Sequence, residues 1–329
     1  MIEVSHLTKK YGANRAVDDL SFTIEKGVIY GLLGPNGAGK STTMNIITGC
    51  LGATDGDVRV GGHSVVDDPM EAKKLIGYLP EQPPLYQEMT PKEYLRFVAQ
   101  AKGIPHKEWN SQLHTVMEKT RIVDVQDRLI RNLSKGYKQR VGIAQALLGN
   151  PEVIILDEPT VGLDPKQIIE IRELIRELGK EHTLVLSSHI LSEVQAVCDH
   201  IMIISKGHLV ASDTPENLTS LFAGTTTIKL EVMGDADAVR SLLSTVDGIE
   251  TAALTTEDGV TRCELTQSGE EDVRAAIFTA FADAKLPILE MTRVRASLED
   301  VFLELTSGEA AAIQPEPADT VDETEVAEE

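Results

Sequence analysis

The stretch GPNGAGKS, from Gly34 to Ser41, decides how the rest of the sequence is interpreted. It matches the pattern G-x-x-x-x-G-K-[ST], and it lies between the apolar run VIYGLL and a segment with a helical pattern. Glycines in such a loop let successive backbone amides turn inward around phosphate oxygens, while the lysine adds positive charge and the hydroxyl can ligate Mg²⁺. The alternative is a glycine-rich turn that only caps a helix. Because a strand and a helix occupy the places that this pattern requires, the sequence favours a phosphate-binding loop.

A second segment fits the same chemistry. The run VIILD, from Val153 to Asp157, is apolar until its last residue, as a strand buried on both faces is, and Glu158 follows it. Asp157 can hold a Mg²⁺ shell, and Glu158, which points differently, can polarise an attacking water. Taken alone, the pair could be two solvated carboxylates that close a strand. Beside a phosphate loop, it favours nucleotide hydrolysis.

The surrounding segments alternate between strand and helix patterns. IEVSHLTKKYG and VDDLSFTIEKG alternate apolar and polar residues and end in glycine, which predicts antiparallel strands. A helix is expected from Thr90, because Thr90, Pro91 and Glu93 form a capping box, and helical patterns continue to about Leu148. Two buried strands, VIILD and TLVLSSH, flank the helix KQIIEIRELIREL. The predicted fold class is an α/β core with a helical insertion.

The pattern changes after about Leu218. Strand, helix, a hairpin around EDG, helix and strand follow in the order β-α-β-β-α-β, which is typical of a small ferredoxin-like α+β domain, and SLEDVFLEL predicts a closing helix. After Gly308 the chain is Ala, Pro and acidic residues with little to bury, so a disordered acidic tail is expected. The expected domains are 1–218, with a helical insertion at about 83–148, then 219–308, and the tail at 309–329.

Composition limits the classes of function. The chain has 329 residues, 42% hydrophobic and 25% charged, enough for one large or two modest domains with real cores. Its net charge of −21 argues against a nucleic-acid partner, whose phosphates would be repelled. The apolar runs are far shorter than the roughly 20 residues that a membrane-spanning helix needs, and no secretory signal is expected. The widely spaced cysteines form no CxxC pair, which fits a reducing cytoplasm.

Four further features are ambiguous when each is taken alone. His189 ends the run TLVLSSH, where a histidine is more often structural than catalytic. Gln82 lies in a proline-rich turn, where a glutamine is usually a surface residue, and Tyr11 could stack on a base or cover a strand end. LSKGYKQR, from Leu133 to Arg140, reads as an ordinary helix start. Their order along the chain is what gives them meaning.

Together these motifs resemble the nucleotide-binding subunit of an ATP-binding-cassette (ABC) transporter. The motifs in chain order are Tyr11, the phosphate loop, Gln82, LSKGYKQR, VIILDE, GLDP from Gly162 to Pro165, and SSH, and they cover roughly the first two-thirds of the chain. The resemblance implies an ABC-type P-loop NTPase core, with antiparallel β and helical subdomains. It also implies an ATP hydrolase that dimerises around two ATP molecules.

The resemblance further implies a role for each motif. Tyr11 would stack on adenine, Glu158 would act as the base toward water, and His189 would contact the γ-phosphate. Asp164 would lie where two nucleotide-binding subunits meet, and Lys40 would serve catalysis. The residues that would wrap the phosphates are Gly34, Pro35, Asn36, Gly37, Ala38, Gly39, Lys40, Ser41 and Thr42. The residues that would hold Mg²⁺ are Ser41, Gln82 and Asp157, and Gln82 would also link the site to the membrane subunit.

By the same resemblance, LSKGYKQR is the signature motif, which contributes to the nucleotide held by a second subunit. Ser134 and the first amides of its helix would face a γ-phosphate across the interface, where a helix N-terminus favours negative charge. The usual pattern is Leu-Ser-Gly-Gly-Gln. Here Lys135 replaces the first glycine and Tyr137 replaces the glutamine, whereas Ser134 and Gly136 remain. The contact normally made from the position of Tyr137 therefore does not carry over.

The single cassette, LSKGY and the appended βαββαβ domain resemble subunits of exporters for drugs, lipids, polysaccharides or gliding-motility components. The resemblance implies separate transmembrane permease subunits, a second copy or a paralogue as dimer partner, and a peripheral place on the cytoplasmic face of the cell membrane. Two alternatives stay open, a soluble ABC ATPase without a membrane subunit and a non-catalytic binding module. The first usually carries tandem cassettes, a coiled coil or basic surface. The second would have lost Lys40 or Glu158, and both are present.

Overall fold

A computed structural model describes residues 1–221, 226–257, 259–267, 272–294 and 298–307. These residues form two compact units. The described part of the first unit is Met1–Asp213, and the second unit is Thr214–Ser307. The division falls before the boundary at 218 that the sequence suggested, because helix α8 (Pro215–Leu221) packs against α11 (Leu298–Ser307) within the second unit. The expected tail at 309–329 lies outside the described residues.

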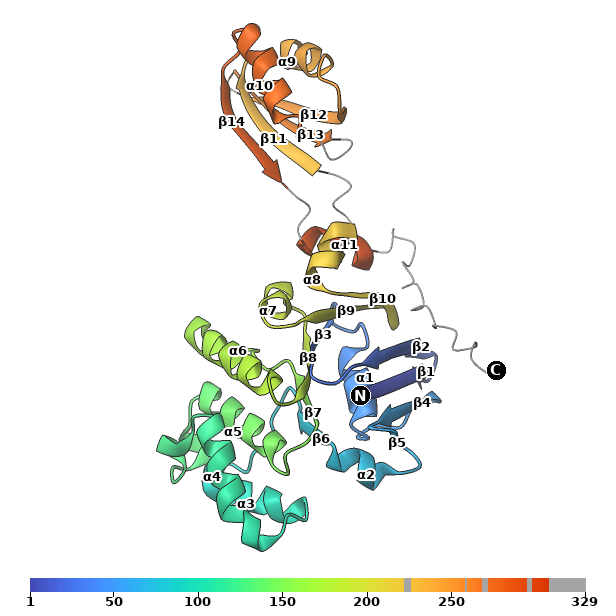
Figure 1. The fold of residues 1–329 in the computed structure, drawn as a ribbon, viewed down its shortest axis with the longest axis vertical. Helices are drawn as coiled ribbons and strands as arrows, with labels where there is room; N and C mark the ends of the chain where they lie inside the picture. Colours follow the sequence, from blue (N-terminus) through green and yellow to red (C-terminus); the bar gives the residue numbers. More distant parts are fainter. Residues whose placement is uncertain (222–225, 258, 268–271, 295–297, 308–329) are drawn as a thin grey trace, which may run out of the picture. The chain divides into compact units, whose positions relative to one another are not determined.

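The first unit combines two sheets with helices on their faces (Figure 1). Its strands are β1 Ile2–Tyr11, β2 Asn14–Ile24, β3 Ile29–Leu33, β4 Asp55–Val60, β5 His63–Ser64, β6 Ile76–Leu79, β7 Val153–Asp157, β8 Thr183–Ser188, β9 His200–Ser205 and β10 His208–Asp213. Its α-helices are α1 Lys40–Ile47, α2 Pro69–Lys74, α3 Pro91–Ala101, α4 Trp109–Lys119, α5 Lys135–Leu147, α6 Pro165–Gly179 and α7 Leu191–Gln195. Short 3₁₀ helices span His106–Glu108, Val123–Val125 and Ile130–Asn132.

The six-stranded sheet brings the sequence motifs to one edge. Its order is β10-β9-β3-β8-β7-β6, and its strands run parallel except for the antiparallel pair β9–β10. All residues of β3, β7 and β8 are buried, which explains their continuous apolar runs. Leu33 pairs with Ser188, and Asp157 pairs with Ser187. The segments that follow β3, β7 and β8 therefore leave the sheet side by side, as ligand sites of parallel sheets require.

The four-stranded sheet has the order β2-β1-β4-β5, and all its neighbouring strands are antiparallel, which confirms the prediction for β1 and β2. One apolar core joins this sheet to α1 and to the six-stranded sheet. Its members include Ile2, Leu20, Met44, Val60 and Ile155. The start of α1, and with it the phosphate loop, is thus anchored on both sheets.

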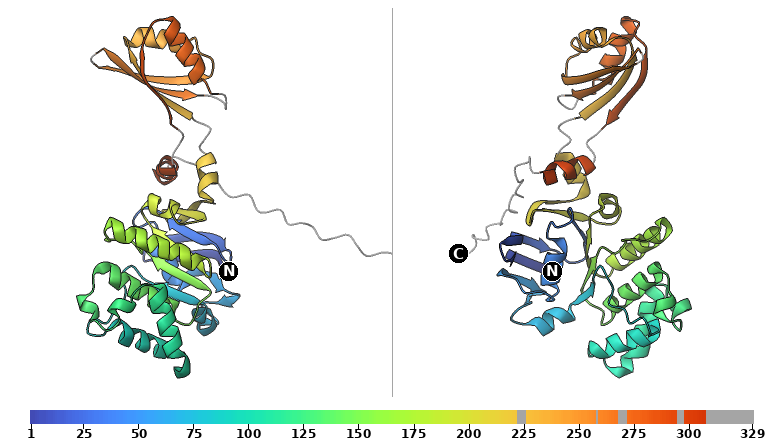
Figure 2. Two further views of the ribbon diagram at one scale, coloured as in Figure 1. Left: turned by 60° about the vertical axis from the view of Figure 1, so that its left-hand side comes forward. Right: turned by 180° about the vertical axis from the view of Figure 1, so that it is seen from behind.

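Helices α3, α4 and α5 form the helical insertion between β6 and β7. They gather on the side of the six-stranded sheet away from β1, β2 and β4 (Figures 1 and 2). The predicted capping box is present, because Thr90 Oγ1 accepts from the Glu93 amide at 3.2 Å and Glu93 Oε2 accepts from the Thr90 amide at 2.9 Å. Helix α5 packs on β6 and β7, so the motif at its start is held in a fixed place relative to the sheet.

The second unit has the predicted β-α-β-β-α-β order. Its sheet has the order β12-β13-β11-β14 with antiparallel pairs throughout, and its core includes Ile228, Leu230, Leu265, Ile277 and Phe281. The elements are β11 Thr226–Met233, α9 Ala236–Leu243, β12 Ile249–Glu257, β13 Val260–Gln267, α10 Arg274–Asp283 and β14 Ile288–Val294, with α8 and α11 at its ends. This topology is ferredoxin-like, as the sequence predicted.

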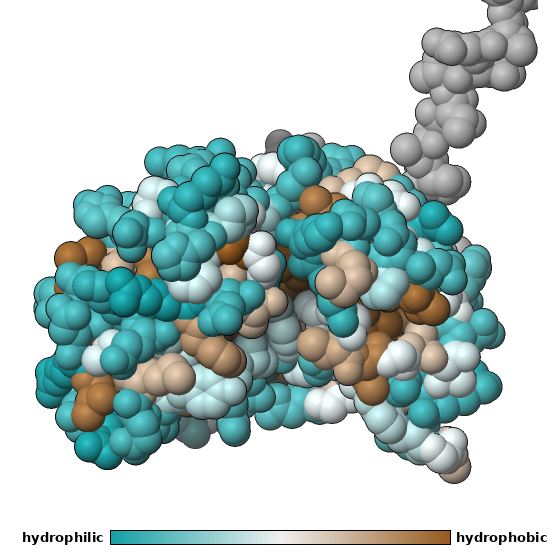
Figure 3. Space-filling view, turned by 90° about the horizontal axis from the view of Figure 1, so that it is seen from below, coloured by the Kyte–Doolittle hydropathy of each residue, from teal (hydrophilic) through white to brown (hydrophobic). Residues whose placement is uncertain are grey.

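No helix among the described residues is long and apolar enough to cross a membrane. The face of the molecule in Figure 3 is mainly hydrophilic, with small and separate hydrophobic patches. Scattered apolar side chains of this kind are normal on a protein surface.

Candidate functional site

The phosphate loop connects β3 to α1 in a conformation that depends on glycine. Gly37 and Gly39 have φ angles of 82° and 111°, which side chains rarely adopt, and a Cβ on Gly39 would lie 2.5 Å from the Ala16 carbonyl oxygen. Lys40 begins α1, and its Nζ donates to the carbonyls of Gly34 and Pro35 at 2.7 and 3.2 Å. The loop thus curls around the ammonium group at the N-terminus of a helix, where anions bind favourably.

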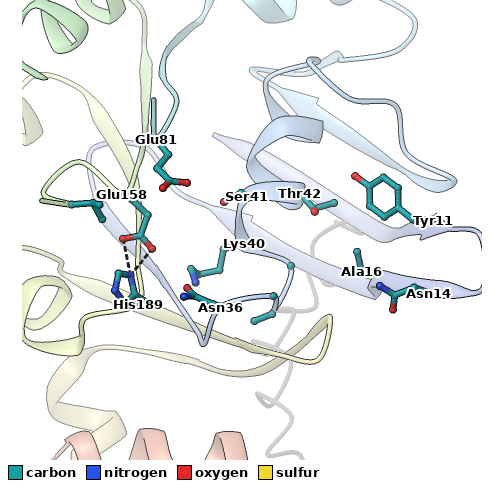
Figure 4. A pocket seen from close by; sticks show the side chains of 14 residues that line it. Tyr11, Asn14, Ala16, Asn36, Lys40, Ser41, Thr42, Glu81, Glu158 and His189 are labelled. Atoms are coloured by element: carbon teal, nitrogen blue, oxygen red, sulfur yellow. Dashed lines mark hydrogen bonds and ion pairs between the residues drawn. The ribbon is translucent and has the colours of Figure 1, made fainter. Parts of the chain in front are cut away.

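A cavity of about 550 Å³ opens in front of this loop (Figure 4), and we call it the ATP cavity after the ligand that the sequence resemblance implies. Strand ends, the loop and the segments after β7 and β8 contribute to its wall. The lining residues are Tyr11, Asn14, Ala16, Asn36, Gly37, Ala38, Gly39, Lys40, Ser41, Thr42, Glu81, Glu158, Val161 and His189. Its size is that of ordinary small-ligand pockets.

Charges of both signs meet at the inner end of the ATP cavity. Lys40 is buried, and burial lowers the pKa of its ammonium group from the ordinary value, while the nearby carboxylates of Glu158 and Asp157 oppose that shift. Asp157, at the end of β7, is also buried, and its Oδ1 accepts from Ser41 Oγ at 3.3 Å and from Ser187 Oγ at 2.5 Å. An acidic oxygen and a hydroxyl oxygen therefore stand side by side next to the first turn of α1.

Glu158 and His189 face each other on the cavity wall. His189 Nδ1 lies 3.0 Å from both carboxylate oxygens of Glu158, and Figure 4 shows the pair beside Lys40 and Asn36. Glu158 is only 8% exposed. Its positive φ of 49° departs from the strand conformation, so its side chain points in a different direction from that of Asp157. Its amide donates to Ser187 Oγ at 3.0 Å. Strained residues of this kind occur at sites where side-chain direction matters.

A second cavity of about 390 Å³ contains the residues of the expected signature site, and we call it the signature cavity. Ser134 and Asp164 are the N-caps of α5 and α6, accepting from the amides of Tyr137 at 3.3 Å and Gln167 at 2.9 Å. A Cβ on Gly136 would lie 2.6 Å from the end of the Gln167 side chain, which would have to move to make room for it. The lining residues are Arg121, Ser134, Gly136, Tyr137, Arg140, Asp164, Lys166, Gln167 and Glu170.

The two departures in the signature motif find partners within the chain. Tyr137 donates its hydroxyl to Asp124 Oδ2 at 2.7 Å, and this bond raises the pKa of the Tyr137 phenol. The Lys135 ammonium lies against Gly162, since a Cβ there would collide with Nζ. Gly162 has a φ of 69° and precedes Asp164 by two residues. Tyr137 thus ties the start of α5 to the 3₁₀ helix Val123–Val125, and Lys135 ties it to the segment before α6.

All but one of the sequence-predicted residues fall into two groups. Around the ATP cavity lie Tyr11, Asn36, Gly37, Ala38, Gly39, Lys40, Ser41, Thr42, Glu158 and His189, with Gly34, Pro35 and Asp157 in contact with members of that set. Around the signature cavity lie Ser134, Gly136 and Asp164. Gln82 is exposed and lines neither of these two cavities.

Sequence reasoning missed several cavity residues. Glu81, next to Gln82, lines the ATP cavity in its place, and Asn14, Ala16 and Val161 also contribute. Val161 lies in the turn after Glu158, and Asn14 begins the strand that follows Tyr11, so proximity to a motif was the one available signal. Ser187, which joins Asp157 to Glu158, had a similar signal in the run SSH.

Comparison with known proteins agrees with these motifs. The family described as ABC transporter matches residues 17–161. The linearmycin resistance ATP-binding protein of Bacillus subtilis is 33% identical, over 93% of this chain and 98% of its own length. The bacitracin transport ATP-binding protein of Bacillus licheniformis is 35% identical, over 94% of this chain and 98% of its own length.

Solved structures give the same result for the fold. An ATP-binding subunit of an ABC transporter is 34% identical with a TM-score of 0.61, covering 68% of this chain and 93% of that one. An ATP-binding cassette in a dimeric post-hydrolysis state, bound to ADP and Pi, is 26% identical with a TM-score of 0.59, covering 65% of this chain and 98% of that one. The predicted fold class and the binding of ATP are thereby confirmed. The chain belongs to the ABC transporter family, as an ATP-binding and ATP-hydrolysing subunit.

Proposed function

We propose that this chain binds MgATP in the ATP cavity and hydrolyses it with Glu158 as the base toward water. The observation that carries the proposal is the contact between Glu158 and His189, 3.0 Å apart on the wall that also contains Lys40 and Ser41. A base must lie within hydrogen-bond reach of the water that it activates, and a second group must fix its direction. His189 orients the Glu158 carboxylate and faces the place of the γ-phosphate.

The loop residues bind and orient the phosphates. The amides from Asn36 to Thr42 surround them, and the Lys40 ammonium exchanges its bonds to the Gly34 and Pro35 carbonyls for bonds to phosphate oxygens. Tyr11 is half exposed at the outer part of the cavity, where its ring offers a face on which adenine stacks. The nucleotide thus lies along the cavity, with its γ-phosphate at Glu158.

The oxygen donors at the inner end fit Mg²⁺. Ser41 Oγ and Asp157 Oδ1 lie 3.3 Å apart, and Mg²⁺ prefers one or two such oxygens together with waters and phosphates. Ser41 would hold the ion directly and Asp157 would order its shell. The ion, when bound, would neutralise charge on the β- and γ-phosphates. Gln82, in the exposed turn beside Glu81, would be a further Mg²⁺ ligand. It would also link the site to the membrane subunit.

The active form is a dimer in which each ATP lies between two chains. Ser134, Gly136 and Asp164 share the signature cavity, which is separate from the ATP cavity of the same chain. A second chain would cover the γ-phosphate with the N-terminus of α5, where a helix dipole favours negative charge. The related cassette that was solved as a dimer with ADP and Pi supports this arrangement.

We further propose that the dimer powers export through separate transmembrane permease subunits, at the cytoplasmic face of the cell membrane. The relatives named for linearmycin resistance and bacitracin transport support an exporter of drug-like or antibiotic molecules. Co-purification of the chain with a hydrophobic membrane protein tests this role. Its isolation as a free dimer, active without any such partner in cells, would favour a soluble ABC ATPase instead.

The hydrolytic role of Glu158 is tested by Glu158→Gln. The amide keeps the shape of the side chain but cannot accept a proton from water, so turnover should fall by roughly 10² or more while ATP binding persists. ATP should then hold the dimer closed, which gel filtration with ATP measures. Glu152→Gln, at an exposed glutamate that pairs with Lys26 at 3.0 Å, is the matched control and should keep normal turnover. Near-normal turnover of Glu158→Gln would remove Glu158 from the catalytic role.

A further inference from the structure

A buried carboxylate outside the ATP cavity connects the segments that carry Glu158 and His189. Glu193, on α7, is only 6% exposed and does not line the ATP cavity. Its Oε2 accepts a hydrogen bond from Thr160 Oγ1, and a second from Ser188 Oγ at 3.2 Å. Thr160 lies two residues after Glu158, and Ser188 directly precedes His189. A single oxygen atom therefore joins the two segments.

The surroundings of Glu193 make this arrangement specific. Thr160 and Ser188 are themselves buried, so their hydroxyl groups depend on protein partners. The second oxygen, Oε1, lies 4.0 Å from a guanidinium nitrogen of Arg172 on α6. Burying a carboxylate costs free energy unless charge and hydrogen bonds compensate it, and here α6, β8 and the turn after β7 all contribute to that compensation.

The contacts of Glu193 hold the backbone around both Glu158 and His189. Thr160 lies inside the turn that the Val161 amide closes on the Glu158 carbonyl at 3.3 Å, and Glu158 sits in that turn with its positive φ. On the other side, Ser188 Oγ also accepts from the Ile190 amide at 3.0 Å, so its position fixes the backbone on both sides of His189. A displacement of either hydroxyl would change the 3.0 Å contact between Glu158 and His189.

We propose that Glu193 is a positioning residue for hydrolysis, which holds Glu158 and His189 in their relative places through Thr160 and Ser188. This inference rests on the proposed catalytic role of Glu158. Glu193 does not line the ATP cavity, so its loss should lower turnover and leave ATP binding unchanged. A misplacement of about 1 Å at a reacting group costs about 10² in rate, which sets the scale of the effect.

The test compares three variants in the full chain by steady-state hydrolysis of MgATP. Glu193→Ala should lower kcat roughly 10- to 100-fold and leave KM for ATP within about twofold. Glu193→Gln should recover most of the loss, because its amide oxygen still accepts from both hydroxyls. Thr160→Val should also lower kcat, and adding it to Glu193→Ala should cause little further loss, since both changes remove the same bond.

Thr120→Val is the matched control for the threonine change. Thr120 is as buried as Thr160 and donates its hydroxyl to the Val116 carbonyl at 2.7 Å, but it lies at the end of α4. Thr120→Val should reduce the thermal stability of the protein without changing kcat. If Glu193→Ala lowers kcat no more than Thr120→Val does, or if the double variant shows fully additive losses, the positioning role is wrong.

A crystal structure of Glu193→Ala provides a readout that does not depend on activity. The contact between His189 Nδ1 and the Glu158 carboxylate should be lost or lengthened by more than about 0.5 Å, the tolerance of a preorganised site. An unchanged contact would overturn the inference even if kcat fell. Normal turnover of Glu158→Gln would instead overturn the proposed function, so the two failures are distinguishable.

Discussion

The buried hydroxyl group of Ser187 contacts both Asp157 and the backbone of Glu158. Its Oγ donates to Asp157 Oδ1 at 2.5 Å and accepts from the Glu158 amide at 3.0 Å, and the residue is fully buried. Asp157 and Glu158 follow each other in sequence, but their carboxylates point in different directions. Asp157 contacts Ser41, and Glu158 contacts His189. Ser187 stabilises the backbone turn that separates them.

Ser187→Ala should therefore impair both stability and hydrolysis. The Glu158 amide would be left without its partner in a buried place, which costs roughly 1–3 kcal/mol of the free energy of unfolding. We expect kcat to fall and the Mg²⁺ concentration for half-maximal activity to rise. Ser64→Ala is the control, since Ser64, in β5, is also buried and donates its hydroxyl to Asp57 Oδ1, in β4, at 3.1 Å. A Ser187→Ala enzyme with the stability loss of the control but normal kcat would contradict this role.

Single residues also show what the sequence could and could not predict. Lys40, Ser41 and Glu158 were named from motifs, because phosphate binding and hydrolysis demand those residue types at those spacings. His189 was ambiguous when taken alone, and its role came from the family resemblance. The turn after β6 was less predictable. Gln82 stays a prediction for this site, whereas its neighbour Glu81, which no motif indicated, lines the cavity. Side-chain direction in a turn follows from backbone angles that residue types alone do not specify.

Helix α5 is held by side-chain contacts at both of its ends. Ser134 caps its N-terminus, and at the other end Lys102 Nζ donates to the carbonyls of Gln145, Ala146 and Leu148 at 3.1, 3.3 and 2.8 Å. A cation at a helix C-terminus satisfies carbonyls that lack partners within the helix and complements the helix dipole. The signature motif thus begins a helix that is fixed at both ends.

Lys102→Met should destabilise the helical insertion without touching the ATP cavity. Losing the ammonium leaves several carbonyls of α5 less well satisfied, and we expect a loss of about 1–2 kcal/mol in the free energy of unfolding. Urea unfolding measures it, and calorimetric titration should give an unchanged Kd for ATP. Lys107→Met, at an exposed lysine in the 3₁₀ helix before α4, should change neither quantity. Equal stabilities of the two variants would show that Lys102 does not support α5.

Elements with strong local signals were predicted well. The capping box of α3 and the buried strands β3, β7 and β8 follow from local residue patterns. The boundary between the units does not follow from such a pattern. Helix α8 belongs with the second unit because it packs on α11, some 80 residues later in the chain. Contacts between distant segments leave no mark in a local pattern.

Each of the two units has its own apolar core, built on two sheets in the first unit and on one sheet in the second. The apolar core of the first unit joins its two sheets through α1, and the core of the second lies between its sheet and helices α9 and α10. Every residue that lines the ATP cavity lies between Tyr11 and His189. The first unit therefore contains the whole lining of this cavity.

A chain that ends at Asp213 should fold and bind ATP. We expect cooperative unfolding and a Kd for ATP within about twofold of the full chain, because no cavity residue and no strand of the six-stranded sheet is removed. Calorimetric titration with MgATP checks this, and Lys40→Ala in the same short chain should abolish binding. Failure of the short chain to fold would show that the first unit depends on residues beyond Asp213.

We propose that each ATP is shared, bound by the phosphate loop of one chain and covered by the signature motif of the other. Mixed dimers that combine Lys40→Ala with Ser134→Arg test this claim most directly. If the site is shared, defects on separate chains spoil one site twice and leave the other intact. Both defects on one chain spoil both sites, while the partner chain stays wild type.

The measurement is the amount of nucleotide trapped per mixed dimer, which does not require the two sites to turn over independently. We predict about one trapped nucleotide per dimer when the defects are on separate chains and almost none when they are on the same chain. If LSKGYKQR only caps α5, or serves the nucleotide of its own chain, the order is reversed. Trapping in the combined-defect dimer but not in the separated one would contradict the shared site.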